Sequence, residues 1–427
     1  MQHSGIDGIK PIYVDSLHRS LREMDHSFPD FQGNIMLSID PKSEDGLKDV
    51  RELLQEQDNF QKSYLKLYED SDLPMTVCAA KSGLDIQEYR AALFENDIRF
   101  RICNGTVIER KIAHHFISRN KESGCVVDAL TAHIIFTLKL QGYIEAVCGP
   151  IHIAQSTLDS FAYRSLHFDH AEARSQGRMY MHDGNPTFSE TPEEHLKSAS
   201  EFRKAEWGWV QENTTVTAVI PDSDIPDKLR ELESITGVKL LDSSVIARSN
   251  NLLLISEDKE IRELSTNLMG TKATWLQPIL DIGLHKGIIP RKRYCEITTE
   301  IALSCVSFYP VTAECLYYQA EKDNFKLSAN FMKLLLFLGA PNSIIRISAD
   351  VAGEFLKFIW RLDIDLTDKC QYASAIFEAL TKHKKSEQAA VLGGIMKAAR
   401  SYGYFIPDLY GHAISWHRGH NIGLGAR

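Results

Sequence analysis

The stretch from Cys125 to Leu140, CVVDALTAHIIFTLKL, decides the fold class. A short apolar run of strand type leads to Asp128, and an apolar segment with the length of a buried helix follows it. The same order recurs at 241–264, LDSSVIARSNNLLLISEDKEIREL, where NLLLISE leads to Asp258 and a helical pattern begins. The runs IHIAQS, VTAVIP and VKLLD also alternate with helical segments. Alternation of this kind predicts a parallel α/β sheet.

Outward from this core, we predict three regions. A mixed, mostly helical N-terminal region spans 1–122, an α/β domain spans 123–282, and an all-α C-terminal bundle spans 283–427. Apolar residues at helical spacing support the bundle, for example in NFMKLLLFL and AGEFLKFIWRL. The chain has 427 residues, which at roughly 100–200 residues per domain allows this division.

Finer features are expected inside these regions. In the N-terminal region, the helical pattern at 43–69 is followed by two short helices around Ser82-Gly83, with Asp85 as a cap. Strands are expected at 34–40, NIMLSID, and at 98–105, IRFRICNG. In the α/β domain, GRMYMHDGNPTFSE predicts a β-hairpin, because Asp-Gly is a preferred hairpin turn.

The composition is that of a globular protein in a reducing compartment. The hydrophobic fraction is 44% and the charged fraction 25%. None of the eight cysteines forms a C-x-x-C pair, and several lie in apolar runs, which indicates buried thiols in the cytoplasm. The N-terminal residues lack a signal-peptide layout, and no apolar run has the roughly 20 residues that span a bilayer, so we expect no membrane contact. The formal net charge of −9 makes any nucleic-acid contact local rather than general.

Three aspartates share one setting. Asp128, Asp242 and Asp258 each follow an apolar run and precede a helical pattern. The carboxyl ends of parallel strands meet at one edge of a sheet, where such folds place their ligands. Converging carboxylates would suit a hard cation. Each aspartate taken alone is more often a helix N-cap, and only the set of three favours a metal site.

Two further groups of acids are weaker candidates. Asp159 follows the strand-like IHIA and is expected within the next helix, where an aspartate is usually solvated. Asp222, Asp224 and Asp227 in PDSDIPD are rivals of Asp242 as the third acid, although their segment is more typical of a polar turn.

These motifs, in this order, resemble the PIN domain family. In that family one acid ends the first strand, a second lies on a following helix, and a third starts a helix whose next strand ends in a Thr/Ser-x-Asp motif. The matching segments here are VVDAL at 126–130, QSTLDSF at 155–161 and the stretch 241–264. The interval between Asp159 and Asp242 is longer than in compact members of the family. The whole chain also resembles a bacterial class with helical segments on both sides of the PIN-like domain, through Gly105-Thr106, Glu109-Arg110, Ala113 and Trp275-Leu276-Gln277.

The resemblance implies a metal-dependent nuclease, most often a ribonuclease. It implies Mg²⁺ or Mn²⁺ held by Asp128, Asp159, Asp242 and Asp258, with Ser256 at the hydroxyl position of the last motif. Glu257 would face away from Asp258 if the strand continued, and is expected on the surface. Single-stranded RNA or DNA would be held by nearby basic residues, for which the candidates are Arg248, Lys259, Arg262, Arg291 and Lys292.

Other classes have less support. No P-loop and no G-x-S-x-G motif is present, and VVDAL lacks the second aspartate that an aspartyl-phosphate hydrolase needs. The serious alternative is a non-catalytic PIN-like scaffold that binds nucleic acid or a partner protein through its helical flanks. Neither a homo-oligomer nor a regulatory protein partner is excluded.

Overall fold

The computed structural model describes residues 44–120, 123–172, 177–182, 184–219, 239, 241–304, 306, 309–341, 343–400 and 406–421. The chain forms two compact units. The first is made of Met1–Ile102 and Thr106–Ile288, and the second of Cys103–Gly105 and Ile289–Arg427. Each unit has its own core, and each is described by itself below.

A five-stranded parallel sheet forms the centre of the first unit. The strand order is β5-β2-β1-β6-β7, so the two strands that precede Asp128 and Asp258 are neighbours. The strands are β1 (Cys125–Val127), β2 (Ile151–Ala154), β5 (Thr215–Thr217), β6 (Leu253–Ile255) and β7 (Ala273–Thr274). Residues of β1 and β6 are fully buried, which is typical of parallel strands covered on both faces.

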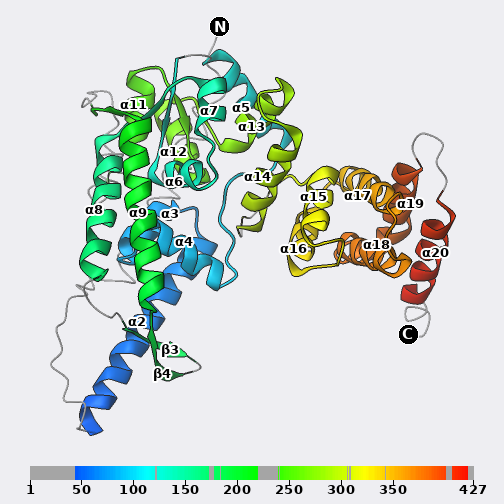
Figure 1. Cartoon of the computed structure of the whole chain (residues 1–427), viewed down its shortest axis with the longest axis horizontal. Coiled ribbons are helices and arrows are strands. Elements are labelled where there is room, and N and C mark those ends of the chain that lie inside the picture. Colours follow the sequence, from blue (N-terminus) through cyan, green and yellow to red (C-terminus); the bar gives the residue numbers. More distant parts are fainter. Residues whose placement is uncertain are drawn as a thin grey trace. The chain divides into compact units, whose positions relative to one another are not determined.

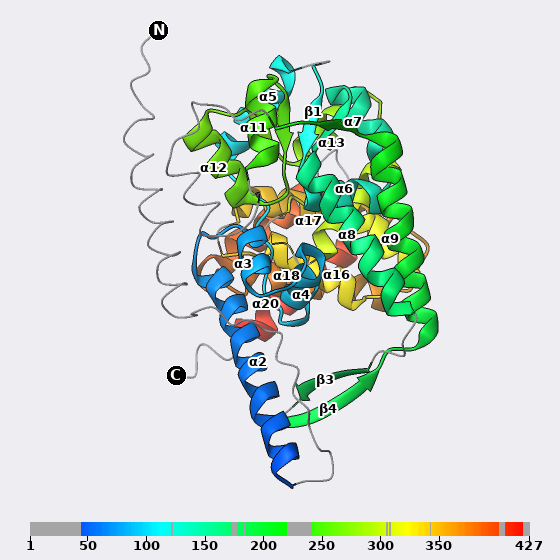
Figure 2. The same ribbon diagram turned by 90° about the vertical axis from the view of Figure 1, so that its left-hand side faces the viewer.

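Helices follow the strands and cover the sheet. One face packs on α11, whose Ile246 and Ala247 contact Val126 and Leu254 in one apolar cluster. Figure 2 shows α11 and α12 to one side of the sheet and α6, α7 and α13 to the other. The helices that belong to this α/β core are α6 (Ala129–Thr137), α7 (Gln141–Cys148), α8 (Gln155–Glu172), α9 (Glu193–Asn213), α11 (Asp242–Ser249), α12 (Lys259–Met269) and α13 (Leu276–His285).

The N-terminal helices belong to the same unit. They are α2 (Glu44–Asp70), α3 (Met75–Lys81), α4 (Ile86–Glu95) and α5 (Val107–Arg119). Asp85 caps α4 in a capping box with Glu88, as its position before the helix predicted. At the far end of α2, Arg51 donates a hydrogen bond of 3.1 Å to the Gly184 carbonyl, which lies between β3 (Gly177–His182) and β4 (Asn185–Glu190). Figure 1 shows this hairpin beside α2.

The second unit is a helical bundle. Its core includes the rings of Phe331, Phe355 and Tyr372, whose centroids lie 4.7–5.6 Å apart. Gly353 allows α17 to approach α19 closely, because a Cβ there would lie 2.6 Å from the Ile395 carbonyl oxygen. The helices are α14 (Arg291–Leu303), α15 (Ala313–Lys322), α16 (Ala329–Leu338), α17 (Ile345–Trp360), α18 (Leu366–Thr381), η1 (Lys385–Glu387), α19 (Gln388–Ala399) and α20 (Pro407–Asn421).

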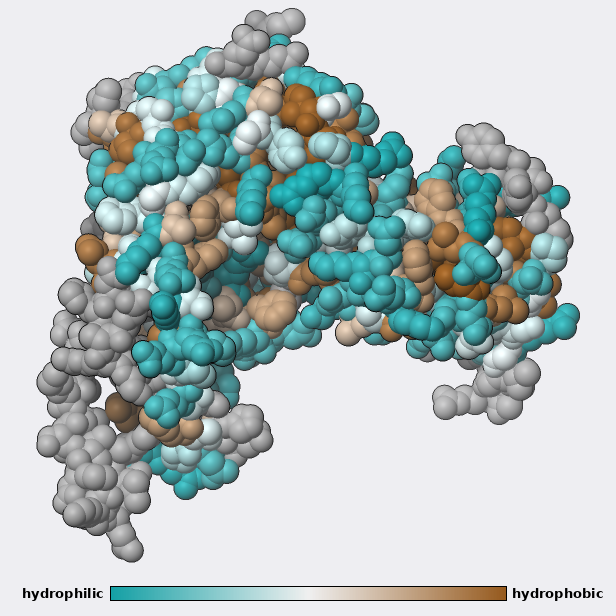
Figure 3. Space-filling model, in the orientation of Figure 1, coloured by the Kyte–Doolittle hydropathy of each residue, from teal (hydrophilic) through white to brown (hydrophobic). Residues whose placement is uncertain are grey.

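The predicted fold class is confirmed. A parallel α/β core is flanked by helices, and the hairpin at β3 and β4 is antiparallel as its turn indicated. Hydrophilic side chains cover most of the face drawn in Figure 3. Among the described residues, no helix is long and apolar enough to cross a membrane.

One expected strand is wrong. The segment 98–105 has a single bridge residue, Phe100, instead of a strand. The backbone of Arg101 bonds elsewhere: its N–H donates to the Tyr68 hydroxyl at 3.0 Å, and its carbonyl accepts from the Lys259 N–H at 3.2 Å. The expected strand at 34–40, residues 222, 224 and 227, and residues 238 and 240 of the VKLLD run lie outside the described residues.

Candidate acidic site

The carboxyl ends of β1 and β6 carry the two best placed acids. Val127 of β1 pairs with Ile255 of β6, so the residues that follow them lie at the same edge of the sheet. Asp128 is the N-cap of α6 and is half-buried. Asp258 is the N-cap of α12 and is only 1% exposed. Both acids are therefore helix caps, as the simpler sequence interpretation held, and both lie where parallel sheets bind ligands.

Asp128 is held by a backbone donor of the helix that it caps. Its Oδ1 accepts the Thr131 N–H at 2.7 Å. Burial raises the pKa of Asp128, while the hydroxyl groups of Ser256 and Thr131 and the Arg262 charge act in the opposite direction.

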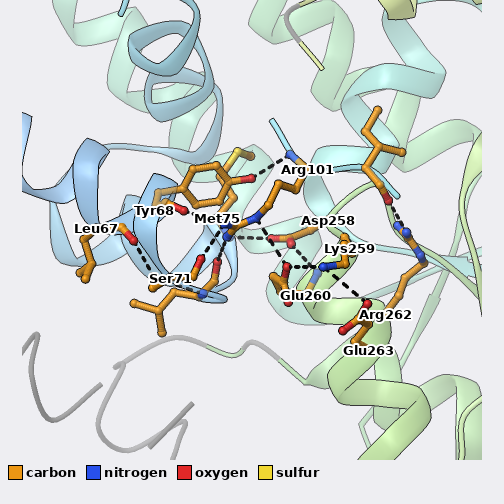
Figure 4. Close-up of polar contacts among 12 residues, drawn as sticks. Leu67, Tyr68, Ser71, Met75, Arg101, Asp258, Lys259, Glu260, Arg262 and Glu263 are labelled. Carbon is orange, nitrogen blue, oxygen red and sulfur yellow. Dashed lines mark hydrogen bonds and ion pairs between the residues drawn. The ribbon is translucent and has the colours of Figure 1, made fainter. Parts of the chain in front are cut away.

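Asp258 is more deeply buried than Asp128. Its Oδ1 accepts the Glu260 N–H at 3.1 Å, and its Oδ2 accepts the Met75 N–H at 2.7 Å, so the first residue of α3 lies directly against it. Figure 4 shows the carboxylate between these two elements. Burial, and then the negative charge of Asp128, raise the pKa of Asp258 to about 6. Because the two carboxylates follow neighbouring strands, the charge of Asp128 disfavours the ionised form of Asp258.

Arg101 holds the N-terminal helices beside Asp258 through hydrogen bonds and an ion pair. Its guanidinium donates to the carbonyls of Tyr68 at 2.7 Å, Ser71 at 2.5 Å and Leu73 at 3.0 Å. Its Nε lies 3.5 Å from a carboxylate oxygen of Glu260, at the start of α12. Figure 4 shows the Arg101 side chain and its hydrogen bonds beside the turn between α2 and α3. One arginine thus joins the α2–α3 turn to the helix that Asp258 caps.

Ser256 lies in the loop that carries Asp258. It is fully buried, and its Oγ accepts the Asp258 N–H at 3.2 Å and donates to the Asp258 carbonyl at 3.3 Å. The hydroxyl therefore supports the backbone of the loop between β6 and α12.

The expectation for Glu257 is wrong. Glu257 is 0% exposed, and one carboxylate oxygen accepts the Leu276 N–H at 2.7 Å, at the start of α13. Its own N–H donates to the Thr131 hydroxyl oxygen at 2.9 Å. Burial raises the pKa of Glu257 to about 7. The strand ends at Ile255, so the alternation of faces that placed Glu257 on the surface no longer applies.

Asp242 and Asp159 lie further along the same edge. The neighbour of Asp242, Ser243, donates to the Val127 carbonyl at 3.3 Å, which places the start of α11 beside the end of β1. The Asp242 carboxylate accepts the Ser156 hydroxyl of α8 at 2.5 Å. Asp159, one turn after Ser156, is exposed and accepts a hydrogen bond from Gln155.

The residues that could hold a cation are thus the pair Asp128 and Asp258, with Asp242 and Asp159 as their neighbours. Within the described part of the chain, no group of three or more His, Cys, Asp or Glu side chains is arranged as a metal site. The donor chemistry nevertheless fits Mg²⁺ or Mn²⁺, which prefer carboxylate oxygens. One further oxygen, Oε2 of Glu257, is buried and has no hydrogen-bond partner among the described residues. The structure therefore places Asp128 and Asp258 together and leaves Asp159 at the surface.

The basic candidates have different surroundings. Arg262 is 6% exposed, and its guanidinium donates to the carbonyls of Ser256, at 2.6 Å, and Ile102. Lys259 pairs with Glu260 and Glu263, at 3.2 and 3.6 Å.

The other basic candidates are more open to solvent. Arg248 is half-buried on α11. In the second unit, the exposed Arg291 and Lys292 of α14 lie 3.1 and 3.8 Å from Glu314 and Glu321. Arg262 therefore supports the site loop, whereas Arg291 and Lys292 are exposed to solvent.

The residues of the wider motif surround the same edge. Thr106 caps α5, and Glu109 on that helix lies 3.8 Å from Arg262. Arg110 forms an ion pair of 2.6 Å with Asp281 of α13. Leu276 of α13 donates to Glu257. The segments at 105–113 and 275–277 therefore both support the loop between β6 and α12, which carries Asp258.

A comparison with protein-family models identifies this domain. Residues 126–267 match the family described as "PIN domain associated with the TPR-GreAB-C-PIN system". The chain contains a PIN-like domain. The match runs from β1 into α12 and includes the four aspartates and Ser256. No curated protein and no solved structure matched the chain.

Thr131 and Glu257 were not among the predicted site residues. The signal for Thr131 was present, since it is a polar residue in the apolar run ALTAHIIF, three positions after Asp128. Glu257 gave no such signal, because its burial depends on where β6 ends and on a contact with α13.

Proposed function

We propose that this protein is a metal-dependent nuclease that cleaves RNA through the acids at the carboxyl edge of its PIN-like sheet. The observation that carries the proposal is the pair Asp128 and Asp258, on adjacent strand ends inside the matched family segment. Asp242 and Asp159 would complete the set directly or through water. PIN domains are generally nucleases, and RNA is favoured by that resemblance.

The chain's own residues have separable roles in this proposal. Asp128 and Asp258 would hold Mg²⁺ or Mn²⁺, and Ser256 supports the loop that carries Asp258 through hydrogen bonds with the Asp258 backbone. Asp128, the more accessible of the two, faces the substrate side. When bound, the cation makes an attacking water more acidic and offsets the charge of the phosphate in the transition state. Arg291 and Lys292, with Arg248 and Lys259, are proposed contacts for the strand.

The location and partners follow from weaker observations. The described cysteines are free and mostly buried, which suits the reducing cytoplasm. The family description names a system with TPR and GreAB-C components, and we propose that a protein or nucleic-acid partner acts together with this chain. A homo-oligomer is compatible with the same scheme.

A non-catalytic scaffold is the second candidate. It is favoured by one observation: each oxygen of the Asp258 carboxylate already accepts a backbone N–H, and the side chain is 1% exposed. In that case Asp258 joins the N-terminal helices to the sheet and holds no cation. A divalent cation that raises the unfolding temperature of the wild type but not of the Asp258→Asn variant would favour the nuclease.

The direct test is a cleavage assay with the full chain. Single-stranded RNA and DNA of equal sequence are incubated with Mn²⁺, with Mg²⁺ or with EDTA. We expect cleavage of RNA in Mn²⁺ or Mg²⁺ and none in EDTA. Absence of cleavage with every divalent ion would contradict the proposal and favour the scaffold.

A further inference from the structure

A groove lies between α19 and α20, the last two helices of the second unit. Its volume is about 840 Å³. Its apolar lining includes Leu392 and Met396 of α19 and Leu409, Tyr410 and Ile414 of α20. On each helix these residues recur at spacings of one, three or four positions, so each helix presents one continuous apolar face to the groove.

The groove is open to solvent on both sides. Tyr410 and Ile414, one helical turn apart on α20, are 47% and 39% exposed. Gly393 of α19 also lines the groove and is exposed, and a Cβ built on it would meet no atom within 4 Å. Apolar surface that faces water is stabilised when another apolar surface covers it. The groove therefore has room for side chains of a partner.

The charges that line the groove have one sign. Lys397 and Arg400 of α19 and Arg418 of α20 belong to the lining, and all three are exposed. Among the described residues, no aspartate or glutamate lines it. The whole chain has a net charge of −9, so the positive charge is a local property of this groove. An acidic partner would be attracted to it, and a basic partner would be repelled.

We propose that the groove between α19 and α20 binds an acidic amphipathic helix of a partner protein. When a helix binds in a groove, its apolar residues at i, i+3, i+4 and i+7 enter the groove. Acidic residues beside this apolar face would then meet Lys397, Arg400 and Arg418. This docking role is independent of the proposed nuclease activity.

Other occupants fit these features less well. In a symmetric contact between two copies of the chain, the same surface faces itself, so the cations of both copies would be brought together. A nucleic-acid strand binds through its phosphates and through base stacking. It would use the cations but leave the aliphatic side chains of Leu392 and Ile414 without an apolar partner.

Two changes test the apolar lining and the charges separately. Gly393→Leu places a side chain inside the groove, and the protein should fold, because the Cβ has open space and leucine favours a helix more than glycine does. Lys397→Glu combined with Arg418→Glu reverses the charge without filling the groove. The control is Gly419→Leu, at an exposed glycine of α20 that does not line the groove and whose Cβ also meets no atom within 4 Å.

The probe is a fluorescein-labelled helical peptide with leucine at i, i+3, i+4 and i+7 and glutamate at its other positions. A second peptide has lysine in place of each glutamate. Binding of each peptide to the full chain is measured by fluorescence anisotropy, and unfolding curves confirm that each variant is folded.

We expect the wild type to bind the glutamate peptide at least about tenfold more tightly than the lysine peptide. Gly393→Leu should weaken binding of the glutamate peptide at least about tenfold, and Gly419→Leu should leave it within about twofold. The double charge reversal should make the lysine peptide the tighter of the two.

Three results would overturn the docking of an acidic helix. They are no binding of the glutamate peptide, equal affinity of the wild type for both peptides, and equal affinity of wild type and Gly393→Leu for the glutamate peptide. If Gly393→Leu instead abolishes binding of single-stranded RNA or a dimer of the chain, the occupant is a nucleic acid or a second copy, and the acidic helix is again excluded. None of these results depends on whether the chain cleaves RNA.

Discussion

At the scale of single residues, Asp258 is an acid whose ionised form is disfavoured by burial and by a neighbouring charge. Its pKa of about 6 lies above the ordinary value of 3.8. The native state therefore keeps this proton to higher pH than the unfolded state does. Between about pH 4 and pH 6, the free energy of unfolding should fall as the pH rises, because the native state binds more protons in this window.

This pH dependence can be measured against Asp258→Asn. Wild type and variant are unfolded with urea in EDTA at pH 4.5 and pH 7.0. We expect the wild type to lose more stability over this interval than the variant, by roughly 1–3 kcal/mol. Glu257 and Glu260, whose pKa values are raised to about 7, contribute to both proteins. Equal losses in the two proteins would show that Asp258 does not titrate in this range.

Residue patterns predicted the acids better than they predicted their surroundings. Asp128 and Asp258 were identified because an aspartate between a strand and a helix is a strong local signal. Glu257 was misplaced, since the rule of alternating faces holds only while the strand continues. Thr131 was missed because a hydroxyl in an apolar run is typical of a helix interior, and its contact with the Glu257 N–H has no local sequence signal.

At the scale of elements, α3 is the helix of the N-terminal region whose backbone bonds the Asp258 carboxylate. Met75 is the first residue of α3, and its N–H donates to Asp258. Proline is tolerated at this helix position, and the extended conformation of Pro74 (φ −58, ψ 141) is compatible with a following proline. Met75→Pro thus removes this one donor without breaking the helix.

The reference for this change is Met75→Ala, because the Met75 side chain is itself buried. Both variants lose the packing of the side chain, and only Met75→Pro loses the N–H. We expect Met75→Pro to be less stable than Met75→Ala by about 1–3 kcal/mol, the cost of an unsatisfied buried carboxylate oxygen. Equal stability of the two in urea unfolding would mean that the bond to Asp258 contributes nothing.

Contacts between residues far apart in the sequence limit how well the arrangement of the elements can be predicted from the sequence. The helices α2 to α5 were expected from their periodicity and caps. The contact between Met75 and Asp258 joins residues 183 positions apart, and no local pattern reports it. The error at 98–105 has the same origin, because the backbone of Arg101 bonds residues of α2 and α12 instead of a neighbouring strand.

At the scale of the whole molecule, nucleic-acid binding must come from local basic sites, since the net charge is −9. Arg291 and Lys292 are exposed on α14. We expect Arg291→Ala and Lys292→Ala together to weaken binding of single-stranded RNA severalfold and to lower its salt dependence, while the rate of the chemical step is unchanged. Binding is measured by fluorescence anisotropy at several salt concentrations. Unaltered affinity and salt slope would remove α14 from the proposed interface.

We propose above all that the acids after β1 and β6 support metal-dependent cleavage. Asp128→Asn tests it most directly, because asparagine remains a good helix N-cap while the charge is lost. The control is Glu145→Gln, an exposed acid on α7 near the opposite end of the sheet.

The measurement is single-turnover cleavage of single-stranded RNA in Mn²⁺ by wild type and both variants. We expect a loss of at least about a hundredfold for Asp128→Asn, equivalent to about 2.7 kcal/mol of transition-state stabilisation, and a wild-type rate for Glu145→Gln. Cleavage by folded Asp128→Asn at the wild-type rate would contradict it.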